Sequence, residues 1–150
     1  MDLKEQINND LKAALLGGDR FVCEVLRGLK SVILNEEVAL GKREVGLEDS
    51  VIEQLIAREV KKRNESAKIY DSAGRQELSE KERSEATILI RYLPEQLSED
   101  EITVVILRII KKLGASDVSS MGKVINAVKG EVGNTADSAV IARLVKNALK

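Results

Sequence analysis

Apolar residues recur every three or four positions along almost the whole chain, which is the period of an amphipathic α-helix. Three such stripes lie in the first half of the sequence and predict helices over residues 3–16, 19–40 and 50–73. Glycine readily adopts the left-handed backbone conformation that ends many helices. It follows each of the three stripes, at Gly17 and Gly18, at Gly41 and at Gly74.

A fourth helix is predicted between a capping signal and a proline. Ser79 and Glu82 have the three-residue spacing of a capping box, so we expect the helix to begin there. It must end by Pro94, because the residue before a proline disfavours helical geometry. We place the domain boundary at this proline, with an N-terminal helical domain over residues 1–94 and a C-terminal domain over residues 95–150.

Three shorter helices are predicted in the C-terminal domain. Ser98 and Glu101 repeat the capping box in front of a fifth helix, which Gly114 closes. A sixth helix is expected over residues 120–129, and a seventh runs from its cap at Asp137 to the C-terminus. No segment alternates polar and apolar residues without also fitting a helix. We therefore predict an all-α fold, in which an N-terminal bundle of about four helices precedes a small three-helix domain.

The sequence lacks the residues of several common catalytic and metal sites. It contains no histidine and one cysteine, Cys23, so Ser/His/Asp triads, Cys/His pairs and histidine metal sites are excluded. No glycine-rich segment has the spacing of a phosphate-binding loop. We expect no catalytic residue, no cofactor and no metal in the isolated chain.

Cysteine content and hydropathy also predict a location. A lone cysteine permits no internal disulfide, which is typical of a reducing compartment. No window approaches the roughly 20 apolar residues of a membrane span, and the first residues lack the pattern of a signal peptide. We therefore expect a cytoplasmic protein with no membrane partner.

Charge is unevenly distributed along a nearly neutral chain. The whole sequence has 24 basic and 25 acidic residues, but residues 102–150 carry 8 basic against 3 acidic residues, a net charge of +5. This is a modest basic surface of the kind that attracts polyanions. The aromatic residues are Phe21, Tyr70 and Tyr92, so a platform for stacking bases is nearly absent.

Gly122 stands inside the sixth predicted helix, where glycine costs about 1 kcal/mol relative to alanine. Two explanations remain open. The glycine either permits close packing of a neighbouring helix or leaves room for a nucleic-acid backbone.

Several strings of residues together resemble one known family. They are Arg63-Asn64-Glu65-Ser66-Ala67, Tyr70, Gly74-Arg75, Glu77-Leu78, Lys81-Glu82, Tyr92-Leu93-Pro94 and Met121-Gly122-Lys123-Val124. On these motifs the chain is similar to the YqeY family of the GatB/YqeY group over essentially its whole length. The resemblance implies that the three-helix domain is like the tail of the B subunit of the Glu-tRNA(Gln)/Asp-tRNA(Asn) amidotransferase, where the homologous unit helps to hold tRNA.

The resemblance suggests a tRNA-binding surface in the C-terminal domain. The residues that could form it are Lys111, Lys112, Gly122, Lys123, Lys129, Arg143 and Lys146. The family commonly has a basic string before the last helix, whereas this chain has Gly133-Asn134-Thr135-Ala136-Asp137-Ser138 there, without a cation. A phosphate contact is therefore not expected at that turn.

Three functions remain open. The first is a non-catalytic or accessory protein that binds tRNA or a tRNA-handling protein complex, with no DNA expected. The second, implied by the family, is a component of glutamine-dependent carbon–nitrogen ligase activity within a complex. The third is a protein-interaction adaptor that uses a polar seam between the third and fourth helices, formed by Arg63, Glu65, Tyr70, Gly74, Arg75, Glu82 and Tyr92; alternatively, this seam only fixes the turn at Gly74.

Overall fold

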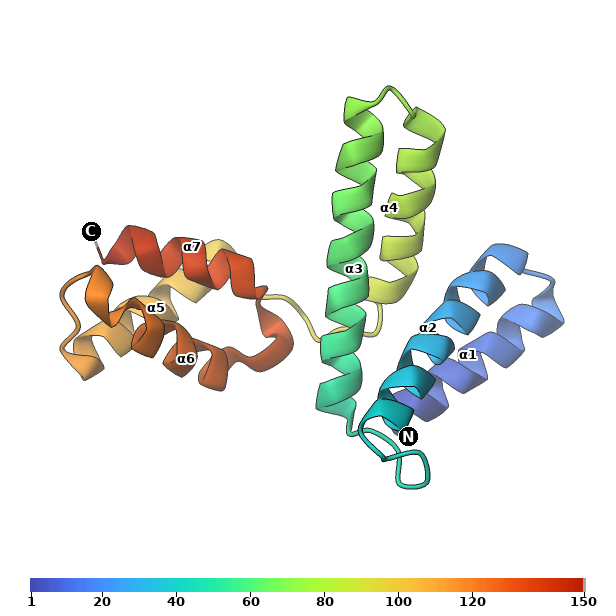
Figure 1. Ribbon diagram of the computed structural model, residues 1–150, viewed down its shortest axis with the longest axis horizontal. Helices are drawn as coiled ribbons and strands as arrows, with labels where there is room; N and C mark the ends of the chain where they lie inside the picture. The colour runs from blue at the N-terminus through green and yellow to red at the C-terminus, as the bar shows by residue number, and fades with distance from the viewer. Residues whose placement is uncertain (150) are drawn as a thin grey trace. The chain divides into compact units, whose positions relative to one another are not determined.

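The computed structural model describes residues 1–149, and within this range it contains α-helices and no strand (Figure 1). The predicted all-α fold class is confirmed. The helices are α1 Leu3–Gly17, α2 Arg20–Ala39, α3 Asp49–Ser72, α4 Gln76–Ile90, α5 Glu99–Leu113, α6 Met121–Val132 and α7 Ser138–Ala148, with short 3₁₀ turns at Val118–Ser120 and Gly133–Thr135.

Backbone contacts divide the chain into two compact units, Met1–Leu93 and the part from Pro94 onward. Each unit has a hydrophobic core of its own. In the N-terminal unit, α1 to α4 all contribute to the core, and Leu26 and Ile56 are completely buried.

The α1–α2 hairpin is built by capping residues at both of its helix starts. Asp2 accepts the Glu5 N–H at 2.8 Å and completes a capping box with Glu5. Gly18, at φ +73°, then ends α1, and the Asp19 side chain accepts the Val22 N–H at 3.2 Å. These contacts turn the chain back within three residues, so that the apolar faces of α1 and α2 pack on one core.

The α3–α4 hairpin turns at Gly74, which has φ +71°, and its two helices lie side by side (Figure 1). The predicted start of α4 at Ser79 is wrong, because the helix begins at Gln76 and Ser79 is completely buried. Its hydroxyl accepts a hydrogen bond from Arg83 within the helix and caps no terminus. The tight turn at Gly74 lets the chain resume helical geometry at once, so the capping-box spacing falls inside the helix.

In the C-terminal unit, the predicted capping box of α5 is confirmed, since Ser98 and Glu101 each accept the other's backbone N–H. The predicted end of α6 at residue 129 is wrong. Val132 packs in the core beside Val128, and this burial carries the helix through Gly130. Helix α6 ends instead where Gly133 takes φ +55°.

The segment before α5 is anchored to the α6–α7 connection of the same unit. The Leu97 N–H donates to the Thr135 carbonyl at 2.8 Å, and the Gln96 amide donates to the Asn134 carbonyl at 3.0 Å. The Asp137 side chain then accepts the Ala139 N–H and caps α7, as predicted. Within residues 1–149, none of the helices has the length and apolar content to span a bilayer.

Candidate functional site

Each helix of the C-terminal unit turns one apolar stripe inward and its basic residues outward. The buried residues are Ile102, Ile106 and Ile109 of α5, Val124, Val128 and Val132 of α6, and Ile141 and Val145 of α7. The predicted tRNA-binding residues occupy the other positions of these helices. All of them are exposed: Lys111, Lys112, Gly122, Lys123, Lys129, Arg143 and Lys146.

Two ion pairs join the helices of this unit and use arginine as the cation. Arg108 of α5 pairs with Glu131 of α6, and Arg143 of α7 pairs with Glu99 of α5 at 2.8 Å. Arg143 is therefore engaged in a contact within the protein. Since both pairs are about half exposed, each contributes little to stability, but together they neutralise two acidic residues of the unit.

Five lysines in the described part of the C-terminal unit have no acidic partner. Among residues 94–149, no ion pair involves Lys111, Lys112, Lys123, Lys129 or Lys146. The side chains of Glu101, Asp117 and Asp137 accept backbone N–H groups at helix or turn starts. Most acidic side chains of the unit are thus used for capping or ion pairing, whereas these five lysines are free to bind an anion.

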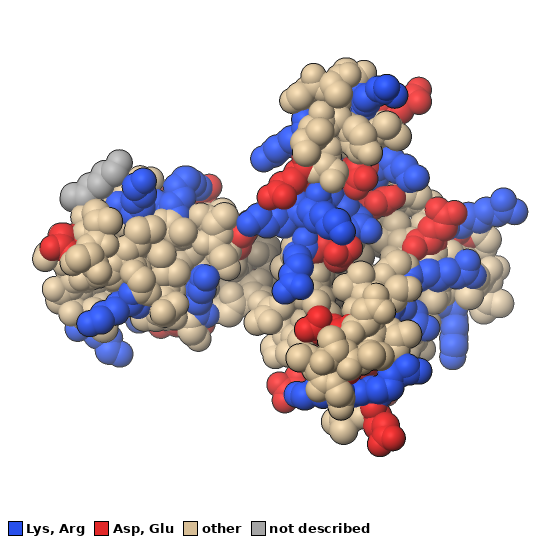
Figure 2. All heavy atoms as spheres, in the orientation of Figure 1, with Lys and Arg blue, Asp and Glu red and all other residues tan. Residues whose placement is uncertain are grey.

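These lysines do not form a single stripe. Lys123 and Lys129 are six residues apart on α6, which places them roughly 120° apart around the helix axis. Figure 2 shows separate Lys and Arg groups on the visible face of the C-terminal unit, with neutral surface between them. This arrangement suits a ligand with many negative charges over an extended surface better than one small anion.

The N-terminus of α6 has no side-chain cap, although the 3₁₀ turn Val118–Ser120 leads directly into it and the Met121 N–H donates to the Val118 carbonyl. The Ser120 side chain makes no capping hydrogen bond, and the first turn holds no acidic residue. A Cβ atom at Gly122 would meet no atom of a neighbouring helix within 4 Å, so close helix packing does not explain this glycine. The positive end of the helix dipole favours an anion at such a terminus, and Lys123 adds a cation in the same turn.

The α6–α7 turn offers no comparable site. The Thr135 hydroxyl donates to the Val132 carbonyl at 2.5 Å, and the Asp137 carboxylate occupies the start of α7. A carboxylate at this helix start repels a phosphate, which agrees with the lack of a cation noted in the sequence.

The proposed polar seam between α3 and α4 is only partly assembled. Arg63 pairs with Glu59 at 2.9 Å and with Glu85 at 3.1 Å, and these three side chains are each less than one-fifth exposed. No hydrogen bond or ion pair joins the other predicted members of the seam to Arg63 within residues 1–149. Glu65 and Arg75 are exposed, Tyr70 and Glu82 are half-buried, and Gly74 makes the turn.

Tyr92 lies apart from the seam. It is buried in the core of the N-terminal unit, and its hydroxyl donates to the Asp10 carboxylate of α1 at 2.5 Å. Burial, and then the hydrogen bond to Asp10, raise the pKa of this phenol above its usual range. Its evident role is to connect the end of the α3–α4 hairpin to α1.

Neither of the two ion pairs that join α3 to α4, Arg63–Glu85 and Asp71–Arg83, was predicted from the sequence. Glu85 could have been found, because Arg63 and Glu85 are equally distant from Gly74 and therefore meet across an antiparallel hairpin. Asp71 and Arg83, which pair at 2.5 Å, show no such symmetry. The hydrogen bond from Arg83 lowers the pKa of the Asp71 carboxyl.

Groups suited to catalysis or metal binding do not converge in the described part of the chain. Cys23 is buried in the N-terminal core, with an exposed fraction of 6%. No cluster of three or more Cys, Asp or Glu side chains within residues 1–149 has the geometry to hold a metal ion.

The fold and the basic surface define a class of small helical protein with two units, the second of which is rich in unpaired lysines. The chain belongs to the family of YqeY-like proteins, which it matches over residues 4–149. It is also similar to "Altered inheritance of mitochondria protein 41, mitochondrial" of Kluyveromyces lactis, with 29% identity over 116 residues and 75% of this chain covered. The match spans 61% of that relative's length. The relative is described as mitochondrial, so the cytoplasmic location expected for this chain stays a prediction.

Proposed function

We propose that this protein binds tRNA through its C-terminal three-helix unit, as a non-catalytic or accessory protein of tRNA metabolism. The observation that carries the proposal is the set of exposed lysines without acidic partners on α5, α6 and α7. The resemblance to the tail of the amidotransferase B subunit selects tRNA from among polyanions.

The surface favours contacts to phosphates over recognition of bases. All three aromatic residues of the chain precede Pro94, so the C-terminal unit has no ring on which a base could stack. The N-terminus of α6, which no side chain caps, carries Gly122 and Lys123 and supplies one place where a phosphate oxygen could approach the backbone closely. Binding of this kind depends on shape and charge and is sensitive to salt.

The role is proposed as non-catalytic because the chain lacks the groups that amide transfer needs. The sequence has no histidine to activate a nucleophile, and the thiol of Cys23 is buried. Any part in glutamine-dependent carbon–nitrogen ligation would then require a partner that carries the reactive groups. Glutaminase activity of the purified chain, assayed with ATP and misacylated tRNA, would contradict this part of the proposal.

Charge reversal in the C-terminal unit tests the proposal. We expect Lys123→Glu/Lys129→Glu/Lys146→Glu to reduce tRNA affinity at 50 mM salt by at least about a hundredfold, because favourable phosphate contacts become repulsive. Fluorescence anisotropy with labelled tRNA measures the affinity, and circular dichroism verifies that the variant remains helical.

A matched control changes the same net charge in the N-terminal unit. Lys12, Lys62 and Lys68 are exposed, and no ion pair involves them within residues 1–149. Their replacement by Glu should leave tRNA affinity within about threefold of the original value. An equal loss in both triple variants would show a non-specific effect of net charge and would refute the assignment to the C-terminal unit.

A further inference from the structure

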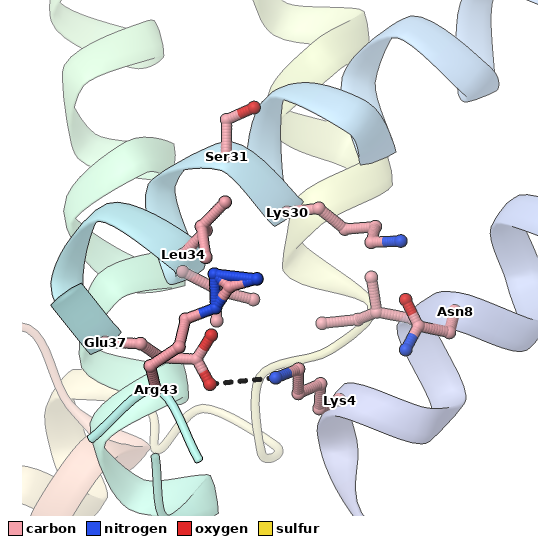
Figure 3. A pocket seen from close by; sticks show the side chains of 9 residues that line it. Lys4, Asn8, Lys30, Ser31, Leu34, Glu37 and Arg43 are labelled. Atoms are coloured by element: carbon pink, nitrogen blue, oxygen red, sulfur yellow. Dashed lines mark hydrogen bonds and ion pairs between the residues drawn. The ribbon is translucent and has the colours of Figure 1, made fainter. Parts of the chain in front are cut away.

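The N-terminal unit contains a pocket that the proposed function does not use. It has a volume of about 290 Å³ and lies between α1, α2 and the loop that follows α2 (Figure 3). Ile7 and Ile33, which are 1% and 2% exposed, belong to its apolar lining, and Leu34 adds a more exposed apolar side chain. The pocket is therefore partly apolar and open to solvent.

Charged side chains from three segments surround this apolar surface. Lys4 comes from α1, Lys30 and Glu37 come from α2, and Arg43 comes from the loop (Figure 3). Lys4 donates to Glu37 at 2.8 Å, and the Glu37 side chain is only 2% exposed. Within residues 1–149, no ion pair involves Lys30 or Arg43. Three cations against one carboxylate leave a surplus of two positive charges.

The loop that carries Arg43 is folded by backbone hydrogen bonds. The Lys42 N–H donates to the Glu37 carbonyl at 2.8 Å, and the Gly46 N–H donates to the Lys42 carbonyl at 2.7 Å. Gly46 has φ +84°, a conformation that favours glycine, and the loop passes close to the Glu37 carboxylate at this point. The backbone at Arg43 thus belongs to a hydrogen-bonded turn beside Glu37.

The end of the loop is fixed as well. Asp49, the first residue of α3, accepts the Leu3 N–H of α1 at 3.1 Å.

Asn8 also lines the pocket, and its side-chain oxygen is buried without a hydrogen-bond partner in the described part of the chain. Because the oxygen of the Asn8 side chain has no hydrogen bond to lose, the amide group can turn over. Its N–H groups can then donate to an anionic ligand.

We propose that this pocket binds a small phosphate monoester with a short apolar body. A phosphate monoester carries a charge of about −1.5 to −2 at pH 7, which matches the surplus of two positive charges around the pocket. Arginine and lysine are the usual phosphate-binding side chains. The apolar lining favours a ligand that carries an apolar group beside its phosphate. The volume of the pocket is close to the lower limit of roughly 300 Å³ for small-molecule sites.

Titration with phenyl phosphate, followed by ¹H–¹⁵N correlation spectra of the full chain, tests the proposal. We expect saturable shifts of the Asn8, Lys30 and Leu34 amide signals below about 10 mM ligand. Inorganic phosphate lacks the apolar body and benzyl alcohol lacks the charge, so each should bind at least about tenfold more weakly than phenyl phosphate. No saturable shift with phenyl phosphate, or an equal response to benzyl alcohol, would overturn the proposal.

Replacement of the unpaired cations identifies the site. Lys30→Gln/Arg43→Gln should weaken phenyl phosphate binding by at least about tenfold. The control Arg58→Gln/Lys62→Gln removes one arginine and one lysine from the exposed surface of α3 and should leave the affinity unchanged. Equal affinity of the first variant and the original protein would contradict the assignment.

This proposal stands independently of tRNA binding. The variant Lys123→Glu/Lys129→Glu/Lys146→Glu should bind phenyl phosphate as the original protein does, because these lysines belong to the other unit. If tRNA shifts the Asn8 and Lys30 signals and phenyl phosphate does not, the pocket serves a nucleic acid and the small-molecule assignment is wrong.

Discussion

Tyr92 illustrates how one buried polar contact connects distant parts of the N-terminal unit. Its hydroxyl donates to Asp10, 82 residues earlier in the sequence, at 2.5 Å. Burial is the main cause of the raised pKa of the phenol, and the hydrogen bond to the carboxylate is the second. Both effects favour the neutral phenol in the folded state.

We expect Tyr92→Phe to lower the free energy of unfolding by about 2 kcal/mol near neutral pH, because one hydrogen bond to a carboxylate is lost. The pKa of Tyr92 is raised on folding, so the stability that the neutral phenol contributes is complete below about pH 10, the pKa in the unfolded chain, and falls as the pH rises further. Urea unfolding should therefore show a smaller difference between the two proteins at about pH 11 than at about pH 8. A difference that does not change with pH would contradict this assignment.

Single residues also show where sequence reasoning reaches its limit. Glu37 follows Leu29 and Ile33 at intervals of four and lies on the buried face of α2, although it was not singled out from the sequence. A carboxylate at a buried position needs a cation or a hydrogen-bond donor as its partner. That partner, Lys4, is 33 residues away, and no spacing rule connects the two. The basic pocket was therefore not predictable from the sequence.

At the scale of helices, two identical capping signals gave different outcomes. Ser98 and Glu101 do cap α5, and the sequence around them has no competing helix start. Ser79 and Glu82 have the same spacing but lie inside α4, because the turn at Gly74 starts the helix earlier. Local motifs therefore located most helices, but the tight turn at Gly74 determined where α4 begins, and the burial of Val132 in the core determined where α6 ends.

The two glycines within α6 allow its stability and its binding to be tested separately. At both Gly122 and Gly130 an added Cβ would meet no atom of a neighbouring helix within 4 Å, and neither residue has a positive φ. We expect Gly122→Ala and Gly130→Ala each to stabilise the protein by up to about 1 kcal/mol, since alanine favours the helix. Thermal unfolding measures this effect.

The same pair of variants should differ in tRNA binding. Gly122 lies in the first turn of α6, where we place a phosphate contact, whereas Gly130 lies in its last turns. Gly122→Ala should weaken binding several-fold, and Gly130→Ala should leave it unchanged. If both variants keep full affinity, the N-terminus of α6 is not part of the interface.

At the scale of the whole molecule, two separate hydrophobic cores imply two units that lose structure separately. Val128 is completely buried in the C-terminal core, and Val128→Ala should destabilise that unit by about 2 kcal/mol through lost packing. Amide hydrogen exchange should become faster in α5, α6 and α7 and stay unchanged around Ile56 in the N-terminal core. Equally faster exchange in both units would show that the molecule unfolds as one cooperative body.

The sequence also predicted the basic character of the C-terminal unit, but not the state of each cation. Arg108 and Arg143 are engaged with Glu131 and Glu99, and this pairing depends on how the three helices pack. The lysines that remain define the surface proposed to bind tRNA. The central claim is therefore that unpaired lysines of this unit hold tRNA by its phosphates.

The salt dependence of tRNA affinity in the intact protein tests this claim most directly. If Lys111, Lys112, Lys123, Lys129 and Lys146 each contact a phosphate, a plot of log affinity against log salt concentration should have a slope of about −4. Affinity would then fall by roughly two orders of magnitude between 50 and 200 mM salt. Absence of tRNA binding at 50 mM salt, or a slope near zero, would contradict the claim.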